Sequence, residues 1–133
     1  MPELRLRIVT IAKVVIDGPA SMVNVTTPDG QVGVLPGHIP LLSVVSPGLL
    51  RYKTKTREYR LVCSSGSIEV KANKVTILVG EAVPVESIDV HRAEAERERL
   101  INLLKHGELP MLELKEARAQ LDHVLAKLRA RTY

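Results

Sequence analysis

The spacing of apolar residues changes near Pro84, and this change constrains the fold more than any other feature of the sequence. Before Pro84, apolar residues alternate with polar ones in short runs, which is typical of strands with one buried face. After Pro84 they recur at steps of three and four, which is typical of one side of a helix. The sequence therefore predicts a β + α fold: an antiparallel β-sandwich or flattened barrel over residues 1–84, then an antiparallel two-helix hairpin over residues 85–133.

Seven runs in the first part have the alternation and the β-branched content of strands. They are residues 4–8, 22–27, 31–35, 49–53, 58–63, 67–71 and 75–79. Residues that favour tight turns separate them, and the predicted turns are Asp17-Gly18-Pro19, Pro28-Asp29-Gly30, Pro47-Gly48 and Ala72-Asn73-Lys74.

Two helices are predicted after Pro84. The first covers residue 89 to about residue 105, with Ser87 or Asp89 as its N-cap and Gly107 as its stop signal. The second begins near Pro110 and carries a heptad-like seam that is narrow, suited to a single partner helix. Because two narrow stripes bury little apolar surface, only about a few kcal/mol hold the hairpin in place, and the sequence leaves open whether it moves.

Composition excludes several classes of function. The chain has 19 basic and 15 acidic residues, a net charge of +4, but no Trp, no Phe and three Tyr, so no nucleic-acid partner is expected. Five of the ten residues from Arg51 to Arg60 are cationic, which favours a solvated strand pair over a dedicated anion site. No apolar run approaches the roughly 20 residues of a membrane span, and no signal peptide is expected.

No catalytic constellation or metal site is predicted. The four histidines, His38, His91, His106 and His123, show no metal-ligand spacing. Cys63, the single cysteine, stands in an apolar run and is expected to be a buried structural thiol. We therefore expect a chain that is not an enzyme and requires no cofactor.

The segment from Gly30 to Leu42 is the most distinctive in the sequence. It reads Gly-Gln-Val-Gly-Val-Leu-Pro-Gly-His-Ile-Pro-Leu-Leu, and its three glycines and two prolines impose an unusual backbone path. This pattern resembles a glycine-proline stretch of the epsilon subunit of F-type ATP synthases, called delta in mitochondria. Matches continue in order, tightest over residues 30–51 and 66–93.

The resemblance implies a non-catalytic central-stalk, or rotor, subunit of the proton-translocating enzyme, with the sandwich against the gamma subunit and the ring of c subunits. It implies contact residues Asp29, Gly30, Gln31 and His38, although His38 is equally a turn histidine satisfied by nearby backbone. Through the complex the chain is expected to be peripheral to a membrane. The expected location is the cytoplasmic face of the bacterial plasma membrane, with an organellar inner or thylakoid membrane as the alternative.

The resemblance also implies a regulatory hairpin that extends along the stalk, meets acidic segments of the alpha and beta subunits and inhibits ATP hydrolysis. Its basic residues would be Arg92, Arg99, Lys115, Arg118, Lys127 and Arg129. For each of these cations, a solvated and internally paired helix surface is an equally good interpretation.

Some bacterial relatives bind ATP through an Ile/Leu-Asp-x-x-Arg-Ala motif, and residues 88–93 match it. The residues implied for ATP as a regulatory ligand are Ile88, Asp89, Arg92, Ala93, Arg99 and Arg129. An upstream acid of those relatives falls at Val83, two residues from Glu81. Asp89 also fits a plain helix cap and Arg92 a surface cation, so the sequence leaves this site open. The alternative function is a stand-alone ligand-sensing module with a mobile helix hairpin.

Overall fold

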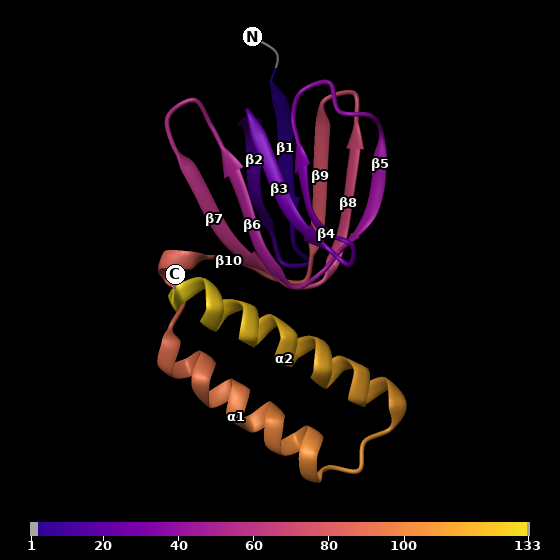
Figure 1. Cartoon of the computed structure of the whole chain (residues 1–133), viewed down its shortest axis with the longest axis vertical. Coiled ribbons are helices and arrows are strands. Elements are labelled where there is room, and N and C mark those ends of the chain that lie inside the picture. Colours follow the sequence, from indigo (N-terminus) through magenta and orange to yellow (C-terminus); the bar gives the residue numbers. More distant parts are fainter. Residues whose placement is uncertain (1–2, 133) are drawn as a thin grey trace.

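The computed structural model describes residues 3–132, and its N-terminal part is a sandwich of two five-stranded sheets (Figure 1). The first sheet has the order β2 (Val14–Ala20), β1 (Leu4–Val9), β9 (Lys74–Val79), β8 (Gly66–Lys71) and β5 (Leu41–Val45). The second has the order β10 (Ala82–Pro84), β7 (Glu58–Cys63), β6 (Gly48–Lys53), β3 (Met22–Thr27) and β4 (Gly30–Val34). Within the described residues, β1 and β9 form the parallel pair and the other pairs are antiparallel.

Alternation along the strands builds the core between the sheets. Leu4, Leu6 and Ile8 of β1 point inward and are fully buried, while Arg5 and Arg7 point to solvent. Cys63 is buried in the same core, and burial raises the pKa of its thiol to about 12, so that the thiol is uncharged and unreactive near neutral pH. The sandwich fold and the buried cysteine predicted from the sequence are both confirmed.

One predicted turn is wrong, and three strands were not predicted. Residues 17–19 lie inside β2, where Asp17 pairs with Arg7 and Pro19 with Arg5 in the strand register. β2 is at the edge of its sheet, where the N–H that Pro19 lacks is not needed for pairing. The other unpredicted strands are the edge strands β5 and β10, which are too short or too apolar on both faces to show a period of two.

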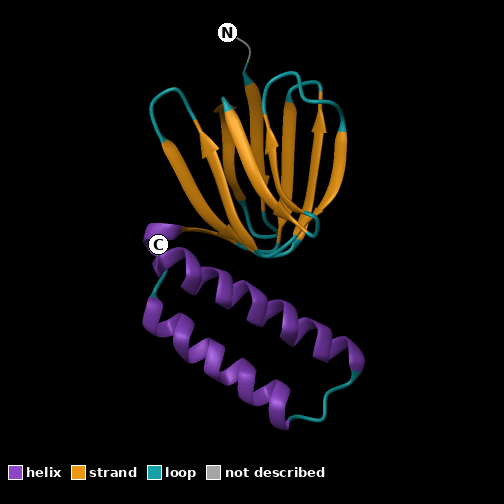
Figure 2. Cartoon of the chain, viewed as in Figure 1, coloured by secondary structure: helices purple, strands orange, loops and turns teal. Residues whose placement is uncertain are grey.

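The C-terminal part contains a short 3-10 turn, η1 (Val85–Ser87), and two helices, α1 (Val90–His106) and α2 (Met111–Thr132) (Figure 2). Asp89 is the N-cap of α1, since its carboxylate accepts a hydrogen bond from the backbone N–H of Arg92 at 3.1 Å. Gly107 ends α1 in an extended conformation, and glycine is required there because a Cβ would lie 2.5 Å from the Leu103 carbonyl oxygen. The antiparallel hairpin predicted from the sequence is thus confirmed.

The two helices pack on each other through one apolar seam and on the sandwich through another. The seam between the helices has buried Ala93, Leu100, Ala117 and Val124 at its centre. The C-terminal half of α2 rests on the outer face of the second sheet, where Ala126 and Ala130 contact a cluster made of Leu49, Val62, Val83, Val85 and Ile88. The hairpin therefore lies across one end of the sandwich (Figure 1).

Gly66 offers a direct test of how tightly the first sheet is packed. A Cβ at Gly66 would lie 1.9 Å from the carbonyl oxygen of Leu78 on β9, so that Gly66→Ala forces two paired strands apart. We expect the free energy of unfolding to fall by about 3 kcal/mol or more, measured by chemical denaturation. Gly18→Ala is the matched control, because nothing lies within 4 Å of its added Cβ. Equal stability of the two variants would contradict the packing described.

Candidate functional site between the sandwich and the hairpin

A cleft of about 650 Å³ lies where the end of the sandwich, η1 and the two helices meet. Charged and polar side chains dominate its lining, and they come from elements far apart in the sequence. The lining residues are Glu81, Val83, Ser87, Ile88, Asp89, Arg92, Ala93, Glu96, Arg99, Gln120, His123, Val124 and Lys127. The cleft is of the size that small molecules occupy.

Successive turns of α1 place charged side chains at this cleft. Arg99 forms an ion pair with Glu96: its Nε lies 3.1 Å from Glu96 Oε2, and a terminal guanidinium nitrogen lies 2.6 Å from Glu96 Oε1. The hydrogen bond from Arg99 lowers the pKa of Glu96, and the same bond raises the pKa of Arg99. Of the two arginines that α1 contributes to the cleft, Arg92 has no ion pair within residues 3–132, so its guanidinium is available to an anion.

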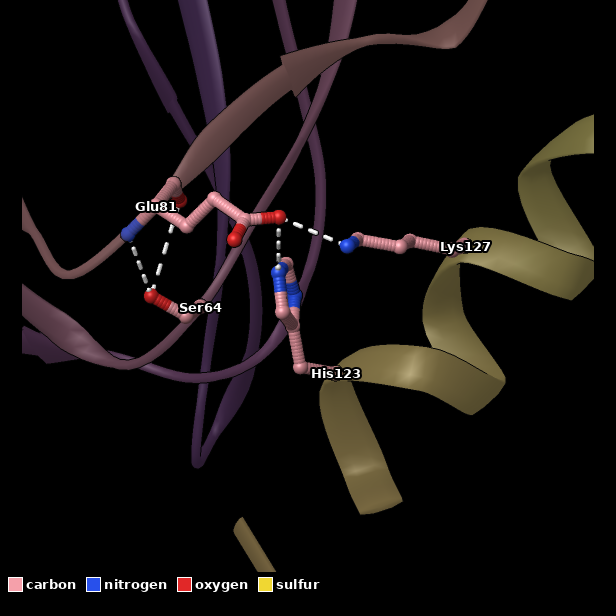
Figure 3. Close-up of polar contacts among 4 residues, drawn as sticks. All are labelled: Ser64, Glu81, His123 and Lys127. Carbon is pink, nitrogen blue, oxygen red and sulfur yellow. Dashed lines mark hydrogen bonds and ion pairs between the residues drawn. The ribbon is translucent and has the colours of Figure 1, made fainter. Parts of the chain in front are cut away.

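The loop between β9 and β10 faces α2 through a cluster of four residues (Figure 3). The Glu81 Oε1 atom lies 2.6 Å from Lys127 Nζ and 3.1 Å from His123 Nε2. Ser64 fixes the backbone of Glu81, because the Glu81 N–H donates to Ser64 Oγ at 2.8 Å and the Ser64 N–H donates to the Glu81 carbonyl at 3.0 Å. The carboxylate is thus presented to the helix from a tethered loop.

The charges of this cluster follow from its surroundings. Burial raises the pKa of Glu81, but the hydrogen bonds from Lys127 and His123 outweigh it, and the net shift is downward. Burial lowers the pKa of His123 and outweighs the opposing effects of Glu81 and the Cys63 backbone. Near neutral pH the cluster therefore contains a carboxylate, an ammonium and a neutral imidazole, whose Nε2–H donates to Glu81.

The structure brings together most of the residues that the resemblance implies for ATP. Ile88, Asp89, Arg92, Ala93 and Arg99 all line the cleft. Arg129 does not, and Lys127, two positions earlier on α2, is the cation that reaches it. Sequence analysis did not find Glu96, Gln120 or His123 for this site; the spacing of His123 and Lys127, four residues apart on one helix face, was the available signal.

Lys115, Arg118 and Arg129 are exposed on α2, away from the cleft, whereas the side chain of Lys127 is only 21% exposed. The hairpin cations predicted as one group therefore fall into two sets. One set faces solvent, and the other, with Arg92, Arg99 and Lys127, faces the cleft.

The structure separates the four residues expected to contact partner subunits. Asp29, Gly30 and Gln31 lie at the start of β4, whereas His38 lies in the loop beyond its other end. That loop is tied to the β8–β9 turn, since the Gly37 N–H donates to Asn73 Oδ1 at 2.8 Å. The His38 ring nitrogen Nδ1 is 2.6 Å from the Ile39 carbonyl. The four residues thus do not form one surface loop.

An apolar row crosses the outer face of the first sheet, and sequence analysis did not identify it. The strand registers align Val44, Ser67, Leu78, Val9 and Val14 across all five strands. Val44 is 57% exposed and Leu78 50% exposed, and Leu42 beside them is 77% exposed. Exposed apolar side chains gathered on one sheet face are typical of an interaction surface.

Two further observations concern the described residues alone. Between residues 3 and 132, no three His, Cys, Asp or Glu side chains gather as a metal ion would require. Neither α1 nor α2 is long and apolar enough to cross a membrane.

Comparison with known proteins identifies the family. Residues 3–85 match the model of the ATP synthase delta/epsilon chain, beta-sandwich domain. The ATP synthase epsilon chain of Halalkalibacterium halodurans is 34% identical over 128 residues, which cover 96% of each chain. The epsilon chain of Desulfosudis oleivorans is 42% identical over 106 residues, which cover 79% of this chain and 80% of that one. The chain therefore belongs to the ATP synthase delta/epsilon family. It matches the epsilon chains, which makes it a non-catalytic subunit of that enzyme.

Solved structures share the fold. A chain of the Euglena gracilis mitochondrial ATP synthase superposes with a TM-score of 0.83 at 21% identity, covering all of this chain and 83% of that one. A chain in the central stalk and c-ring structure of the Tetrahymena thermophila mitochondrial enzyme gives a TM-score of 0.64 at 18% identity, covering 96% of each. The full-length match to epsilon chains is evidence against the alternative of a stand-alone sensor.

Proposed function

We propose that the chain is a central-stalk subunit whose sandwich binds the gamma subunit and the c ring, and whose hairpin restrains ATP hydrolysis. The observation that carries the stalk role is the exposed apolar row on the outer face of the first sheet. Leu42 and Val44 on β5 and Leu78 on β9 leave apolar surface exposed to water on either side of Ser67, which a partner with apolar side chains of its own would cover. The Tetrahymena structure that shares this fold is of a central stalk and c ring, which supports the same assignment.

The row and the hairpin lie on different sheets, so both can be used at once. The row belongs to the outer face of the first sheet, whereas α2 rests on the outer face of the second. Polar Asp29, Gly30 and Gln31, at one end of β4, suit polar loops of the c ring, and His38 at the other end would reach a different part of the assembly. The complex would hold the chain at the cytoplasmic face of a bacterial plasma membrane, in keeping with its bacterial relatives.

Binding to gamma gives the first functional test. Leu78→Glu places a charge in the centre of the apolar row, and we expect binding of the purified chain to gamma to weaken at least about tenfold. Leu112→Glu is the control, because Leu112 is also an exposed leucine but lies at the start of α2. Biolayer interferometry with immobilised gamma measures both. Unchanged binding of Leu78→Glu would exclude the row as the gamma surface.

The regulatory role rests on the outward cations of α2. Lys115, Arg118 and Arg129 are exposed and can engage acidic segments of the alpha and beta subunits through charge-assisted hydrogen bonds once the hairpin extends. Removing residues 91–133 in the assembled enzyme should raise the rate of ATP hydrolysis about fivefold or more. A factor of about five is the lower end of the range by which one site typically affects another. A steady-state hydrolysis assay measures the effect. An unchanged rate would remove the inhibitory role and leave the stalk role intact.

The cleft is also the proposed site for ATP as a regulatory ligand. The unpaired guanidinium of Arg92 and the nearby Lys127 suit phosphate oxygens, and Asp89 holds the first turn of α1 in place. Arg129 does not line the cleft, so we assign to Lys127 the ligand contact that the resemblance implies for Arg129. The carboxylates of Glu81 and Glu96 oppose an anion, which makes weak binding the expectation.

Calorimetric titration with ATP and Mg²⁺ tests this site. We expect heat of binding from the unaltered chain and from Arg97→Ala, whose arginine is exposed on α1 outside the cleft, and none from Arg92→Ala. If Arg92→Ala binds as well as the unaltered chain, or if no variant gives heat at millimolar ATP, the cleft is not a nucleotide site.

A further inference from the structure

We propose that Lys127 and His123 form an anion site that the chain fills with its own Glu81 carboxylate, and that this internal anion latches the hairpin to the sandwich. The proposal deepens the regulatory role, because it names what holds the hairpin down when no ligand is bound. It requires neither ATP nor gamma, so its test is independent of theirs.

Both donors of the latch converge on one oxygen atom. Lys127 Nζ and His123 Nε2 lie 2.6 Å and 3.1 Å from the same Glu81 Oε1 (Figure 3). The donors stand four residues apart on one face of α2, and the acceptor comes from the loop that joins the two sheets. Hydrogen bonds in which one partner is charged are shorter and about twice as strong as neutral ones.

The rest of the contact between the hairpin and the sandwich is small. From α2, the buried apolar side chains that meet the second sheet are Ala126 and Ala130, each of which contributes a single methyl group. Of the ion pairs within residues 3–132, those of Glu81 alone join a helix to the sandwich. Because little apolar surface is buried, the polar bridge is a large part of what holds the hairpin in place.

The acceptor is held ready for the helix. One backbone hydrogen bond with Ser64 and one to the Ser64 hydroxyl fix the loop at Glu81, so little conformational entropy is lost when the carboxylate meets α2. His123 is buried, and the hydrogen bond that orients its ring joins Nε2 to Glu81 Oε1. This imidazole is therefore well placed in the docked state only while it donates through Nε2 to Glu81.

Acid should loosen the latch. The groups that face His123 are Glu81 from the β9–β10 loop, the Cys63 backbone from β7, Lys127 on α2, and Arg92, Glu96 and Arg99 across the cleft on α1. Since burial lowers the pKa of docked His123 below its ordinary 6.5, a released hairpin takes up a proton more readily than a docked one. Docking is thus strongest above pH 6.5 and weakens as the pH falls below that value.

Hydrogen–deuterium exchange of the full chain at neutral pH tests the latch. In Glu81→Gln we expect peptides from α2 to exchange at least about tenfold faster, a factor that corresponds to about 1.4 kcal/mol, while peptides from β8 and β9 keep their protection. Glu94→Gln is the control, because Glu94 is exposed on α1 outside the cleft. Equal protection of α2 in the two variants would overturn the proposal.

If Glu81→Gln disturbs the sandwich, buried Cys63 will react with a thiol reagent. Two further variants keep the test decisive in that case. Lys127→Glu and Glu81→Lys each place like charges together and should release α2. The double variant restores an opposite pair and should return the protection of α2 to within about threefold of the original. If α2 exchanges as fast in the double variant as in either single variant, these residues act only through packing.

Discussion

The position of the hairpin depends on a contact made by two alanines. Ala126 and Ala130 let α2 approach the outer face of the second sheet closely, over Leu49, Val62 and Val83. The helices themselves are joined by a larger seam that includes Leu100, Leu121 and Leu128. Since stabilisation follows the apolar area buried, the two helices should part from the sandwich more easily than from each other. Our proposal that the hairpin moves as one body rests on this imbalance.

In the proposed function, the sandwich keeps the two tasks of the chain apart. Its first sheet offers an apolar row to a partner, and its second sheet carries the hairpin, so that release of α2 leaves the row undisturbed. The core between the sheets is closely packed, with Val23, Val25, Ile68 and Ile77 fully buried, and it forms a rigid base against which the helices can move. Separate sheets for the partner and for the hairpin would let the subunit stay bound to a stalk while its hairpin changes position.

Local patterns in the sequence predicted most of the fold because they depend on neighbouring residues. Alternation revealed seven strands, and the cap at Asp89 and the stop at Gly107 marked the ends of α1. β2 and β5 escaped notice because edge strands tolerate Pro19 and outward-facing Leu42, which break the expected pattern.

The cleft was harder to predict, because it depends on how the hairpin is docked. Glu81 and His123 are 42 residues apart in sequence, and nothing local to either reveals the pairing. Residues two positions apart on a helix point about 200° away from each other, so the choice between Lys127 and Arg129 follows from the rotation of α2 about its axis. The contact of Ala126 and Ala130 with the sheet, together with the Glu81 bridge to Lys127, sets that rotation.

Single-molecule energy transfer between dyes on exposed Ile39 and Leu112 tests the central claim, that the hairpin leaves the sandwich while the sandwich stays bound. These positions lie in the β4–β5 loop and at the start of α2, so their separation reports the docking of the hairpin. The account predicts one high-transfer population for the isolated chain at neutral pH, and a second population of lower transfer in the assembled enzyme. A single high-transfer population in the assembled enzyme, whatever the pH or nucleotide, would contradict it.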